Sequence, residues 1–497
     1  MAMHQPLGSS RFGRISARFG SVLPCFVGIF VALGTTGCLR LKTVATAGAT
    51  SSEGPTKYMD TTSRLDSWEV KDEAGKSGHF ILDGKPFCFS GTNNYYLSWK
   101  STKMCDDVLV SAKEMNLTVM RTWGNQERGS LDGSVPNTDG DGTKEGVYYQ
   151  YWDTKKQHPS YNDDEKTGLG RLDYVLFKAR ELGIKLILTL TNNWQDTGGM
   201  DQYVKWYGGK CHHEFYTDPK IRGAFKDYVK HLVERVNHLN NIPYREDPTI
   251  FAWELANEPR TINYAKYDCP SGWDKTTMVT WAADVSAYIK SIDPNHMVAV
   301  GDEGFLTTGG HWLFEATDGV DHQALTAVKH VDFGTFHLYP ETWQTGLKIM
   351  QRFIQENLDS GRKVGKPTVL EEYGIMVQRN ENNEISGGWQ RREITYKNWN
   401  ELVMRGGAAG SMFWILSGYD DYLGTYPDHD HFTIYKGDRT HQLMAPYFQN
   451  FATQAQACRG ADANLGTPSP FVKATRMQTV AVLDAPSVMV ALGASAE

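Results

Sequence analysis

The strongest constraint on the fold of this chain is a regular alternation of short apolar runs with amphipathic stretches. Near-continuous apolar runs separated by helical periodicity are typical of a parallel sheet that helices cover on both faces. Eight such units predict an α/β fold, a closed (β/α)8 TIM barrel, rather than an open doubly wound sheet. The expected strands are 87–93, 117–123, 184–192, 250–257, 296–301, 331–337, 367–372 and 410–416. The clearest helical stretches are 103–115, 172–182, 221–239, 275–292, 347–358 and 392–404.

The remaining segments are expected to flank this barrel. Residues 68–82 are predicted to form a short hairpin that caps its amino-terminal end. We expect a single barrel domain at 67–459, a Ser/Thr/Gly-rich linker at 48–66 and a disordered tail at 460–497. No Gly-x-Gly-x-x-Gly or phosphate-binding loop follows an early run, so the sequence does not indicate a nucleotide-binding sheet.

The first residues have the composition of a targeting segment. Residues 1–47 contain no acidic side chain, arginines precede the apolar run 22–39, and 45–47 fits the small-x-small pattern of a signal-peptidase site. We therefore expect 1–47 to be a secretory signal peptide and the protein to be secreted. The alternatives are a type II membrane anchor and an organellar transit peptide. No second apolar segment of spanning length occurs, so no stable membrane partner is expected.

Charge and cysteine content exclude several classes of protein. A net charge of −7 gives no global basic field, so nucleic acid is not an expected partner. No Cys-x-x-Cys occurs, which argues against zinc ribbons and dithiol redox chemistry. One or two disulfides with at least one free thiol are expected, and the sequence leaves their pairing open. The cysteines beyond residue 47 are Cys88, Cys105, Cys211, Cys269 and Cys458.

Polar residues are concentrated where the expected strands end. The carboxyl ends of the strands in a (β/α)8 barrel meet at one face, and the side chains there form the active site. Six strand ends bring carboxylates, amides, a guanidinium, an imidazole, a phenol and indoles, a combination that packing alone does not explain. These segments are Arg121–Trp123, Asn192–Trp194, Trp253–Arg260, His337–Tyr339, Glu371–Gly374 and Trp414.

Two of these residues, Glu258 and Glu372, indicate glycosidic bond cleavage. Glu258 follows the fourth expected strand and Glu372 ends the seventh, so the barrel would place them on opposite sides of one site. Cleavage of a glycosidic bond needs one carboxyl group to protonate the leaving oxygen and a second to attack or to direct water. The competing interpretation is that each is a surface carboxylate at a helix start, where the helix dipole favours negative charge. The neighbouring polar residues favour the catalytic interpretation.

The motifs around these glutamates resemble those of a known family. The segments GKPFCFSGTNNYYL, VMRTWG, LTNNWQDTGG, FAWELANEPR, DPNHMVAVGDEG, FGTFHLYPETW, PTVLEEYG and GSMFWIL occur in order between about residues 68 and 457. The chain resembles the endo-β-1,4-mannanases of glycoside hydrolase family 5, in clan A. The resemblance implies a retaining (β/α)8 glycoside hydrolase that cleaves internal β-1,4-mannosidic bonds in mannan, glucomannan or galactomannan.

The resemblance also assigns catalytic roles to residues of this chain. Glu258 matches the acid/base and proton donor, and Glu372 matches the nucleophile. Asn257 would hydrogen-bond the 2-hydroxyl of the sugar in subsite −1. The supporting residues are Arg121, which would keep Glu372 ionised, Asn257, His337, which would fix the acid/base side, and Tyr339, which would hydrogen-bond the nucleophile.

A further set would bind the substrate. Trp414 would form the floor of subsite −1, Trp123 and Trp194 would stack on sugars, and Arg260 would act beyond the cleaved bond. The substrate-binding residues are thus Trp123, Asn193, Trp194, Arg260 and Trp414. An aromatic content of 12%, with 14 Trp and 24 Tyr, fits either such a site or an aromatic core.

Two local expectations follow. The pKa of Glu258 should be high and that of Glu372 low, because this split separates an acid from a nucleophile. Glu371, adjacent to Glu372 in an extended strand, should point to the opposite face.

Three polar clusters were weighed as metal sites. Residues 211–214, 428–431 and 137–148 contain ligand-type side chains, but their spacing and the residue at the twelfth position of the last one favour ordinary loops. No metal and no cofactor are expected, and β-mannan is the expected partner of a monomeric enzyme. The alternatives are a β-1,4-glucanase or a mannan transglycosylase using the same two glutamates, and a non-catalytic carbohydrate-binding barrel.

Overall fold

The structure is a computed structural model that describes residues 65–68, 78–83, 85–138, 141–264, 267–455 and 458. All of them belong to one compact unit, Thr61–Glu497. The expected signal peptide, nearly all of the expected linker and the expected tail lie outside the described residues.

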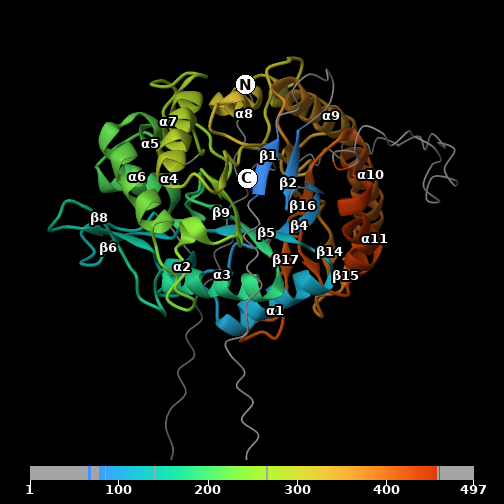
Figure 1. Ribbon diagram of the computed structural model, residues 1–497, viewed down its shortest axis with the longest axis horizontal. Helices are drawn as coiled ribbons and strands as arrows, with labels where there is room; N and C mark the ends of the chain where they lie inside the picture. Colours follow the sequence, from blue (N-terminus) through green and yellow to red (C-terminus); the bar gives the residue numbers. More distant parts are fainter. Residues whose placement is uncertain are drawn as a thin grey trace, which may run out of the picture. The chain divides into compact units, whose positions relative to one another are not determined.

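The central element is a sheet of eight parallel strands, which confirms the expected barrel (Figure 1). The hydrogen-bonded order is β11-β10-β9-β5-β4-β16-β13-β12. Between its two ends, the backbone N–H of Asp332 before β12 donates to the carbonyl of Val298 in β11 at 2.8 Å. Each expected apolar run overlaps one of these strands, and β12 and β13 end one residue beyond the expected runs. They are β4 (Phe89–Asn93), β5 (Val119–Trp123), β9 (Lys185–Thr189), β10 (Ile250–Glu254), β11 (Met297–Ala299), β12 (Gly334–Leu338), β13 (Thr368–Tyr373) and β16 (Gly410–Phe413).

One principal helix follows each strand and packs outside the sheet (Figure 1). The stretch expected to be helical to residue 239 ends at Val233, because the chain turns back and the N–H of Asn237 donates to the carbonyl of Ile242 at 3.0 Å. The eight helices are α1 (Thr102–Glu114), α3 (Gly170–Leu182), α6 (Pro219–Val233), α7 (Thr277–Ile292), α8 (His322–Ala327), α9 (Leu347–Val364), α10 (Trp389–Gly406) and α11 (Arg439–Gln454).

Strand side chains alternate between two apolar layers. Val119, Ile187, Ala252 and Val369 belong to the cluster inside the barrel. Their successors Met120, Leu188, Trp253 and Leu370 belong to the cluster between the barrel and the helices. Because side chains alternate along a strand, the next inward positions are 121, 189, 254 and 371. These positions carry Arg, Thr, Glu and Glu, so the barrel interior changes from apolar to polar toward the carboxyl ends of its strands.

The amino-terminal end of the barrel is closed by an antiparallel sheet of β1 (Leu65–Trp68), β2 (His79–Leu82) and β3 (Lys85–Phe87). This confirms the expected cap, with a third strand added to the hairpin. Phe80 in β2 is fully buried, with its ring centroid 5.1 Å from that of Phe251 and 5.3 Å from that of Phe333. The cap therefore completes the apolar layer at the end of the barrel where the strands begin.

The remaining elements are insertions between strands and helices. The longest, between β5 and α3, contains the sheet β6-β7-β8. The insertions are β6 (Glu127–Ser130), α2 (Asp141–Lys144), β7 (Gln150–Asp153), β8 (His158–Tyr161), η1 (Gln195–Thr197), α4 (Gly199–Trp206), α5 (Glu214–Thr217), η2 (Tyr244–Glu246), η3 (Trp312–Phe314), η4 (Thr317–Gly319), β14 (Gln378–Arg379), β15 (Ile385–Gly387), β17 (Leu416–Ser417) and β18 (Ile434–Tyr435).

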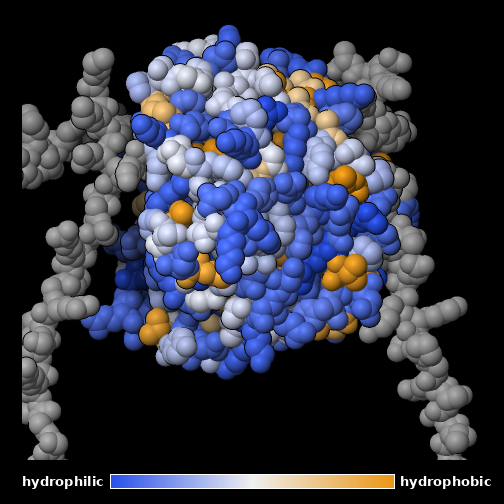
Figure 2. Space-filling view, turned by 90° about the vertical axis from the view of Figure 1, so that its left-hand side faces the viewer, coloured by the Kyte–Doolittle hydropathy of each residue, from blue (hydrophilic) through white to orange (hydrophobic). Residues whose placement is uncertain are grey.

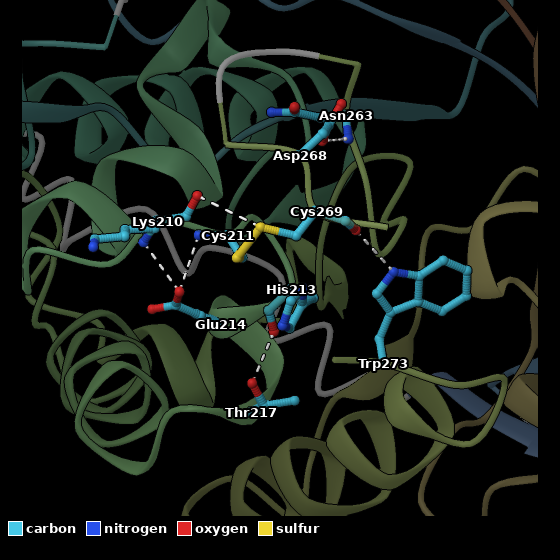
Figure 3. Close-up of a disulfide and its surroundings, with 9 residues drawn as sticks. All are labelled: Lys210, Cys211, His213, Glu214, Thr217, Asn263, Asp268, Cys269 and Trp273. Atoms are coloured by element: carbon cyan, nitrogen blue, oxygen red, sulfur yellow. Dashed lines mark hydrogen bonds between the residues drawn. A yellow bond between two sulfur atoms is a disulfide. The ribbon is translucent and has the colours of Figure 1, made fainter. Parts of the chain in front are cut away.

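Two disulfides resolve the pairing that the sequence left open. Cys88 pairs with Cys458, and Cys211 pairs with Cys269, while Cys105 is a buried free thiol. Figure 3 shows the second bridge beside Glu214, whose carboxylate accepts the backbone N–H groups of Lys210 and Cys211, each at 3.0 Å. The residues 211–214, weighed above as metal ligands, thus form a disulfide-linked turn.

The described surface carries few clustered apolar side chains. Figure 2 shows one face, on which hydrophobic residues form small separate patches among hydrophilic ones. Within the described ranges, no helix combines the length and hydropathy that crossing a membrane requires.

Candidate active site

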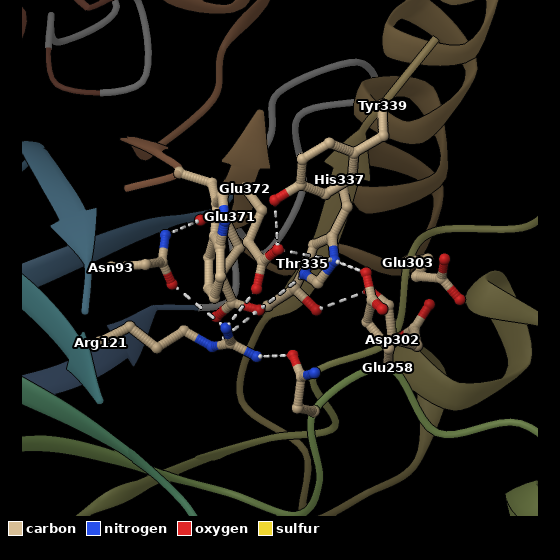
Figure 4. Close-up of polar contacts among 12 residues, drawn as sticks. Asn93, Arg121, Glu258, Asp302, Glu303, Thr335, His337, Tyr339, Glu371 and Glu372 are labelled. Carbon is tan, nitrogen blue, oxygen red and sulfur yellow. Dashed lines mark hydrogen bonds and ion pairs between the residues drawn. The ribbon is translucent and has the colours of Figure 1, made fainter. Parts of the chain in front are cut away.

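The two glutamates singled out from the sequence lie together at the carboxyl ends of the barrel strands (Figure 4). Glu372 is in β13, and Glu258 follows β10 in a left-handed backbone conformation with φ 47°. The N–H of Glu258 donates to the carbonyl of Gly301 at 2.9 Å, which ties this turn to the end of β11. One oxygen of each carboxyl group lies within 4.8 Å of the other. That separation fits a retaining mechanism, for which about 5–5.5 Å is typical, and not an inverting one, which needs about 6.5–9.5 Å.

Glu372 receives hydrogen bonds on both oxygens. Arg121 Nη1 donates to Oε1 at 2.5 Å, and the Tyr339 hydroxyl donates to Oε2 at 2.6 Å. His337 Nδ1 lies 3.7 Å from Oε2. These contacts fix the orientation of the carboxylate and place Arg121 and Tyr339 as the sequence predicted.

Glu258 has a separate pair of donors. His337 Nδ1 donates to Oε1 at 2.8 Å, and Trp194 Nε1 donates to Oε2 at 2.6 Å. His337 is therefore next to the acid/base candidate, as expected, and it also lies between the two glutamates. Trp194 was expected to stack on a sugar, and its indole N–H in addition holds Glu258.

The pKa split between the glutamates is opposite to the expectation. Burial raises the pKa of Glu372, and the charges of His337 and Arg121 offset this only in part. Burial acts in the same sense on Glu258, but the hydrogen bond and charge of His337 outweigh it, so the pKa of Glu258 is lowered. Burial opposes protonation of His337, yet the charge of Glu372 and the hydrogen bond to Glu258 raise its pKa well above the usual value. His337 Nδ1 and Glu258 Oε1 lie 2.8 Å apart, so the protonation states of these two groups are linked.

Glu371 also departs from the expectation, because its side chain does not point away from the site. It is fully buried, with Oε2 3.4 Å from His337 Nε2 and 3.6 Å from Arg121 Nε. Alternation from Val369 already directs Glu371 into the barrel. A register shift follows, in which Phe336 pairs with Leu370 but His337 pairs with Glu372. This β-bulge turns Glu372 to the same side as its neighbour (Figure 4).

A third buried glutamate, Glu254, lies in the same layer and was given no role from the sequence. It accepts hydrogen bonds from Arg121 Nε at 2.9 Å and from the Thr189 hydroxyl at 2.7 Å. Asn93 of β4 completes the layer, since its Oδ1 accepts from Arg121 Nη1 at 3.1 Å. The signal that could have found these residues is strand alternation, because Glu254 lies two positions after the inward Ala252 and Asn93 four positions after the inward Phe89.

The two asparagine predictions have different outcomes. Asn257 lies in the site, where its Oδ1 accepts from Arg121 Nη2 at 2.7 Å and its Nδ2 donates to Asn192 Oδ1 at 3.0 Å. Asn193, expected to bind substrate, is fully buried. Its Oδ1 contacts His212 Nε2 at 3.0 Å and accepts the backbone N–H of Arg260 at 3.1 Å. The prediction of a direct sugar contact by Asn193 is therefore wrong, because this side chain supports the loop behind the site.

Arg260 is also more engaged with the protein than expected. Its guanidinium forms two hydrogen bonds with Glu303, at 2.6 and 2.7 Å, and a third with Asp318 at 2.9 Å. It lies 5.4 Å from the ring centre of Trp194 and 5.8 Å from that of Tyr264. Arg260 is 6% exposed, whereas Tyr264 is 50% exposed. The exposed surface on this side therefore consists of Tyr264 and Trp194, with Arg260 beneath them.

Aromatic side chains line the opposite side of the site. Trp414 is half-buried, stacks on Tyr95 at 5.9 Å and meets the buried ring of Trp123 edge-on at 5.8 Å. The indole N–H of Trp414 donates to Asp430 Oδ2 at 2.6 Å. The position of Trp414 fits the expected floor of subsite −1. Asp430, in the loop 428–431 that was weighed above as a metal site, orients this tryptophan.

The described residues contain one group of three His, Cys, Asp or Glu side chains whose donor atoms all lie within 4.8 Å, namely Glu258, His337 and Glu372. These groups already form hydrogen bonds, His337 with Glu258, Glu258 with Trp194, and Glu372 with Arg121 and Tyr339.

Comparison with known proteins agrees with this geometry. The family described as GH family 5 beta-mannosidase-like matches residues 71–442. A mannan endo-1,4-β-mannosidase F of Aspergillus fumigatus is 36% identical over 366 residues, which covers 72% of this chain and 73% of the relative.

Solved structures give the same result. The endo-1,4-β-mannanase of Rhizomucor miehei has a TM-score of 0.68 at 34% identity, and the match covers 78% of this chain and 99% of that one. The endo-β-1,4-mannanase of Thermotoga petrophila has a TM-score of 0.63 at 38% identity, and the match covers 75% of this chain and 78% of that one.

Proposed function

The chain belongs to the β-mannosidase-like group of glycoside hydrolase family 5, and from this premise we propose that it is an endo-acting retaining enzyme that cleaves internal β-1,4-mannosidic bonds of mannan, glucomannan or galactomannan. The observation that carries the proposal is the pair of carboxyl groups, Glu258 and Glu372, within 4.8 Å and each held by its own donors. The names of its relatives support mannan as the substrate.

The reaction proceeds in two displacements. A Glu372 oxygen attacks the anomeric carbon, the bond from that carbon to the leaving oxygen breaks, and Glu258 gives its proton to this oxygen. Water then attacks the same carbon, the ester bond to Glu372 breaks, and Glu258 takes the proton of the water. The hydrogen bonds from His337 and Trp194 stabilise the ionised Glu258 that acts as base in the second step.

The neighbouring residues prepare these steps. Arg121 and Tyr339 stabilise the negative charge of Glu372 until attack and keep the attacking oxygen in place. Asn257, held by Arg121, presents its amide toward the 2-hydroxyl of the sugar in subsite −1. Trp414 provides the flat apolar surface under that sugar.

The substrate is tested by incubating the full chain with linear β-1,4-mannan and with carboxymethyl-cellulose, and measuring the reducing ends released. Release from mannan alone is expected. Release from carboxymethyl-cellulose alone would leave the assignment of the two glutamates unchanged but would identify β-1,4-glucan as the substrate. Chain-length redistribution of manno-oligosaccharides without net release of reducing ends would identify a transglycosylase.

The catalytic assignment is tested with Glu258→Gln. This variant should lose hydrolysis on substrates with poor leaving groups and keep oligosaccharide binding, because the amide preserves shape but carries no transferable proton. Wild-type activity of the variant would contradict the assignment. Binding without hydrolysis by the wild-type chain would make it a carbohydrate-binding barrel.

We extend the proposal to the location and state of the protein. The basic and apolar pattern of residues 1–47 supports secretion, and the separate, small apolar patches on the face drawn in Figure 2 support a monomer. Detection of the protein in culture medium, and its elution volume in size-exclusion chromatography, test these two points.

A further inference from the structure

Beneath the nucleophile, the carboxyl groups of Glu254 and Glu371 approach the same nitrogen, Arg121 Nε, which lies 2.9 Å from Glu254 Oε1 and 3.6 Å from Glu371 Oε2. Glu254 comes from β10 and Glu371 from the bulge of β13, and both are fully buried. Two buried carboxyl groups beside the same guanidinium nitrogen repel each other strongly when both are ionised. Neither residue transfers a proton to the substrate in the mechanism above, so this arrangement needs a separate explanation.

The hydrogen-bond donors around the pair are unevenly distributed. Oε1 of Glu254 accepts hydrogen bonds from Arg121 Nε at 2.9 Å and from the hydroxyl of Thr189 at 2.7 Å. Arg121 Nη2 lies 2.7 Å from the same oxygen. The contacts of Glu371 Oε2 are longer, 3.4 Å to His337 Nε2 and 3.6 Å to Arg121 Nε. Oε1 of Glu371 is buried, and no donor among the described residues reaches it. An ionised carboxylate with such an oxygen would be costly to bury.

The charge of the cluster leads to the same conclusion. The guanidinium of Arg121 forms ion pairs with three carboxyl groups, those of Glu254, Glu371 and Glu372, and none of the side chains is more than 5% exposed. If all three were ionised, two negative charges would remain uncompensated by Arg121. The other ionisable group facing the pair is His337 on β12, while Thr189 on β9 and Asn93 on β4 are uncharged.

We propose that Glu254 and Glu371 share one proton, so that the pair carries a single negative charge and balances Arg121 from below. The shared proton leaves Glu372 as the ionised carboxylate on the upper side of Arg121. Burial raises the pKa of Glu254 to about 8, with the charge of Arg121 opposing this rise and Glu371 adding to it. Both residues are positioning residues, because they act on the nucleophile through Arg121. The effect of the pair on the nucleophile rests on the proposed function, whereas the shared proton does not.

The shared proton is tested by infrared difference spectroscopy at pH 6, which detects protonated carboxyl groups. The full-length wild type is compared with Glu254→Gln, Glu371→Gln and the double variant. Each single substitution leaves one carboxyl group, which then ionises and keeps the charge unchanged. Each single variant should therefore lose the same one protonated-carboxyl band, and the double variant should lose nothing further. Loss of the band in only one of the two single variants, or in neither, would overturn the proposal. Glu303→Gln, which removes a separate buried carboxyl group, is the matched control and should leave this band intact.

The pH dependence of thermal unfolding is an independent readout. The pair binds a proton in the folded chain that the unfolded chain has released above about pH 4.3. The stability of the wild type therefore falls as pH rises from about 5 to 8, and both single variants lack this loss. The difference in Tm, variant minus wild type, should become more positive by at least about 3 °C over this interval. A constant difference would show that no shared proton exists.

The consequence for catalysis is tested with the same variants. The double variant removes the negative charge that balances Arg121 from below, so it should lower kcat/KM at least about tenfold beyond the product of the two single effects. Additive effects would limit the pair to a structural role. Because the spectroscopic and thermal readouts need no substrate, they succeed or fail independently of the proposed mannanase activity.

Discussion

Replacement of Tyr339 by phenylalanine isolates one hydrogen bond of the nucleophile. Tyr339 is 8% exposed, and its hydroxyl donates to Glu372 Oε2 at 2.6 Å. Burial raises the pKa of Glu372, and this hydroxyl is one of the groups that lower it. A hydrogen bond to a charged group contributes about 1.5–3 kcal/mol, and one pKa unit corresponds to about 1.4 kcal/mol. Loss of the hydroxyl should therefore raise the pKa of Glu372 by about 1–2 units.

The direction of the effect on activity follows from the role of Glu372. The nucleophile must be ionised, so a higher pKa moves the acidic limb of the pH profile of kcat/KM to higher pH. Tyr339→Phe should thus lose activity about tenfold or more on the acidic side and much less at the pH optimum. The assay is kcat/KM on a soluble linear β-1,4-manno-oligosaccharide, measured across the profile.

A matched control separates this effect from the loss of any buried hydroxyl. Tyr149 is fully buried, and its hydroxyl donates to the carbonyl of Ser98 at 3.0 Å, away from both glutamates of the site. Tyr149→Phe should leave the acidic limb in place. If Tyr339→Phe lowers kcat/KM equally at every pH, the hydroxyl does not tune Glu372, and the reasoning from its hydrogen bond is wrong.

Three further predictions concern other parts of the molecule. Trp194→Phe removes the N–H that the ionised Glu258 accepts, so the pKa of the acid should rise and the alkaline limb of kcat/KM should move up by about one pH unit; a downward or absent shift would contradict this contact. Phe80→Ala opens a cavity at the closed end of the barrel and should cost about 3–5 kcal/mol in denaturant unfolding with kcat unchanged; an equally stable variant would show that the cap is dispensable. Replacing both Cys211 and Cys269 by serine releases a link across 58 residues and should cost about 2–4 kcal/mol, measured as a lower Tm than that of the wild type under non-reducing conditions.

The fold could be predicted from the sequence because its signals are local. Each barrel strand is an apolar run of a few residues, and the helix after it shows its own periodicity, so eight units are visible without knowledge of any distant contact. The start of α6 has a similarly local cause, since Asp218 caps its first turn and Pro219 occupies a position that needs no N–H donor. Its end was misplaced by six residues because the turn after Val233 depends on a contact with Ile242.

The site could be predicted only in part. The positions of Glu258, Glu372, Arg121, His337 and Tyr339 follow from their places at strand ends, where the barrel topology brings them to one face. The sequence alone could not show that Asn193 is buried or that Arg260 is already paired. Those facts depend on residues from other loops that approach only in the folded chain.

The sequence by itself therefore determined the eight-stranded barrel, the end of it where the candidate site lies and the two glutamates proposed to carry out the reaction. Only the tertiary structure decided that Glu371 and Glu372 point to the same side, how burial and neighbouring charges shift the pKa values of the buried glutamates, and which cysteines pair. The physical reason is that alternation and helical periodicity are properties of neighbouring residues. A β-bulge depends on the register between two strands, and a pKa depends on every charge and on all the burial around a group, so neither can be read from one segment of the chain.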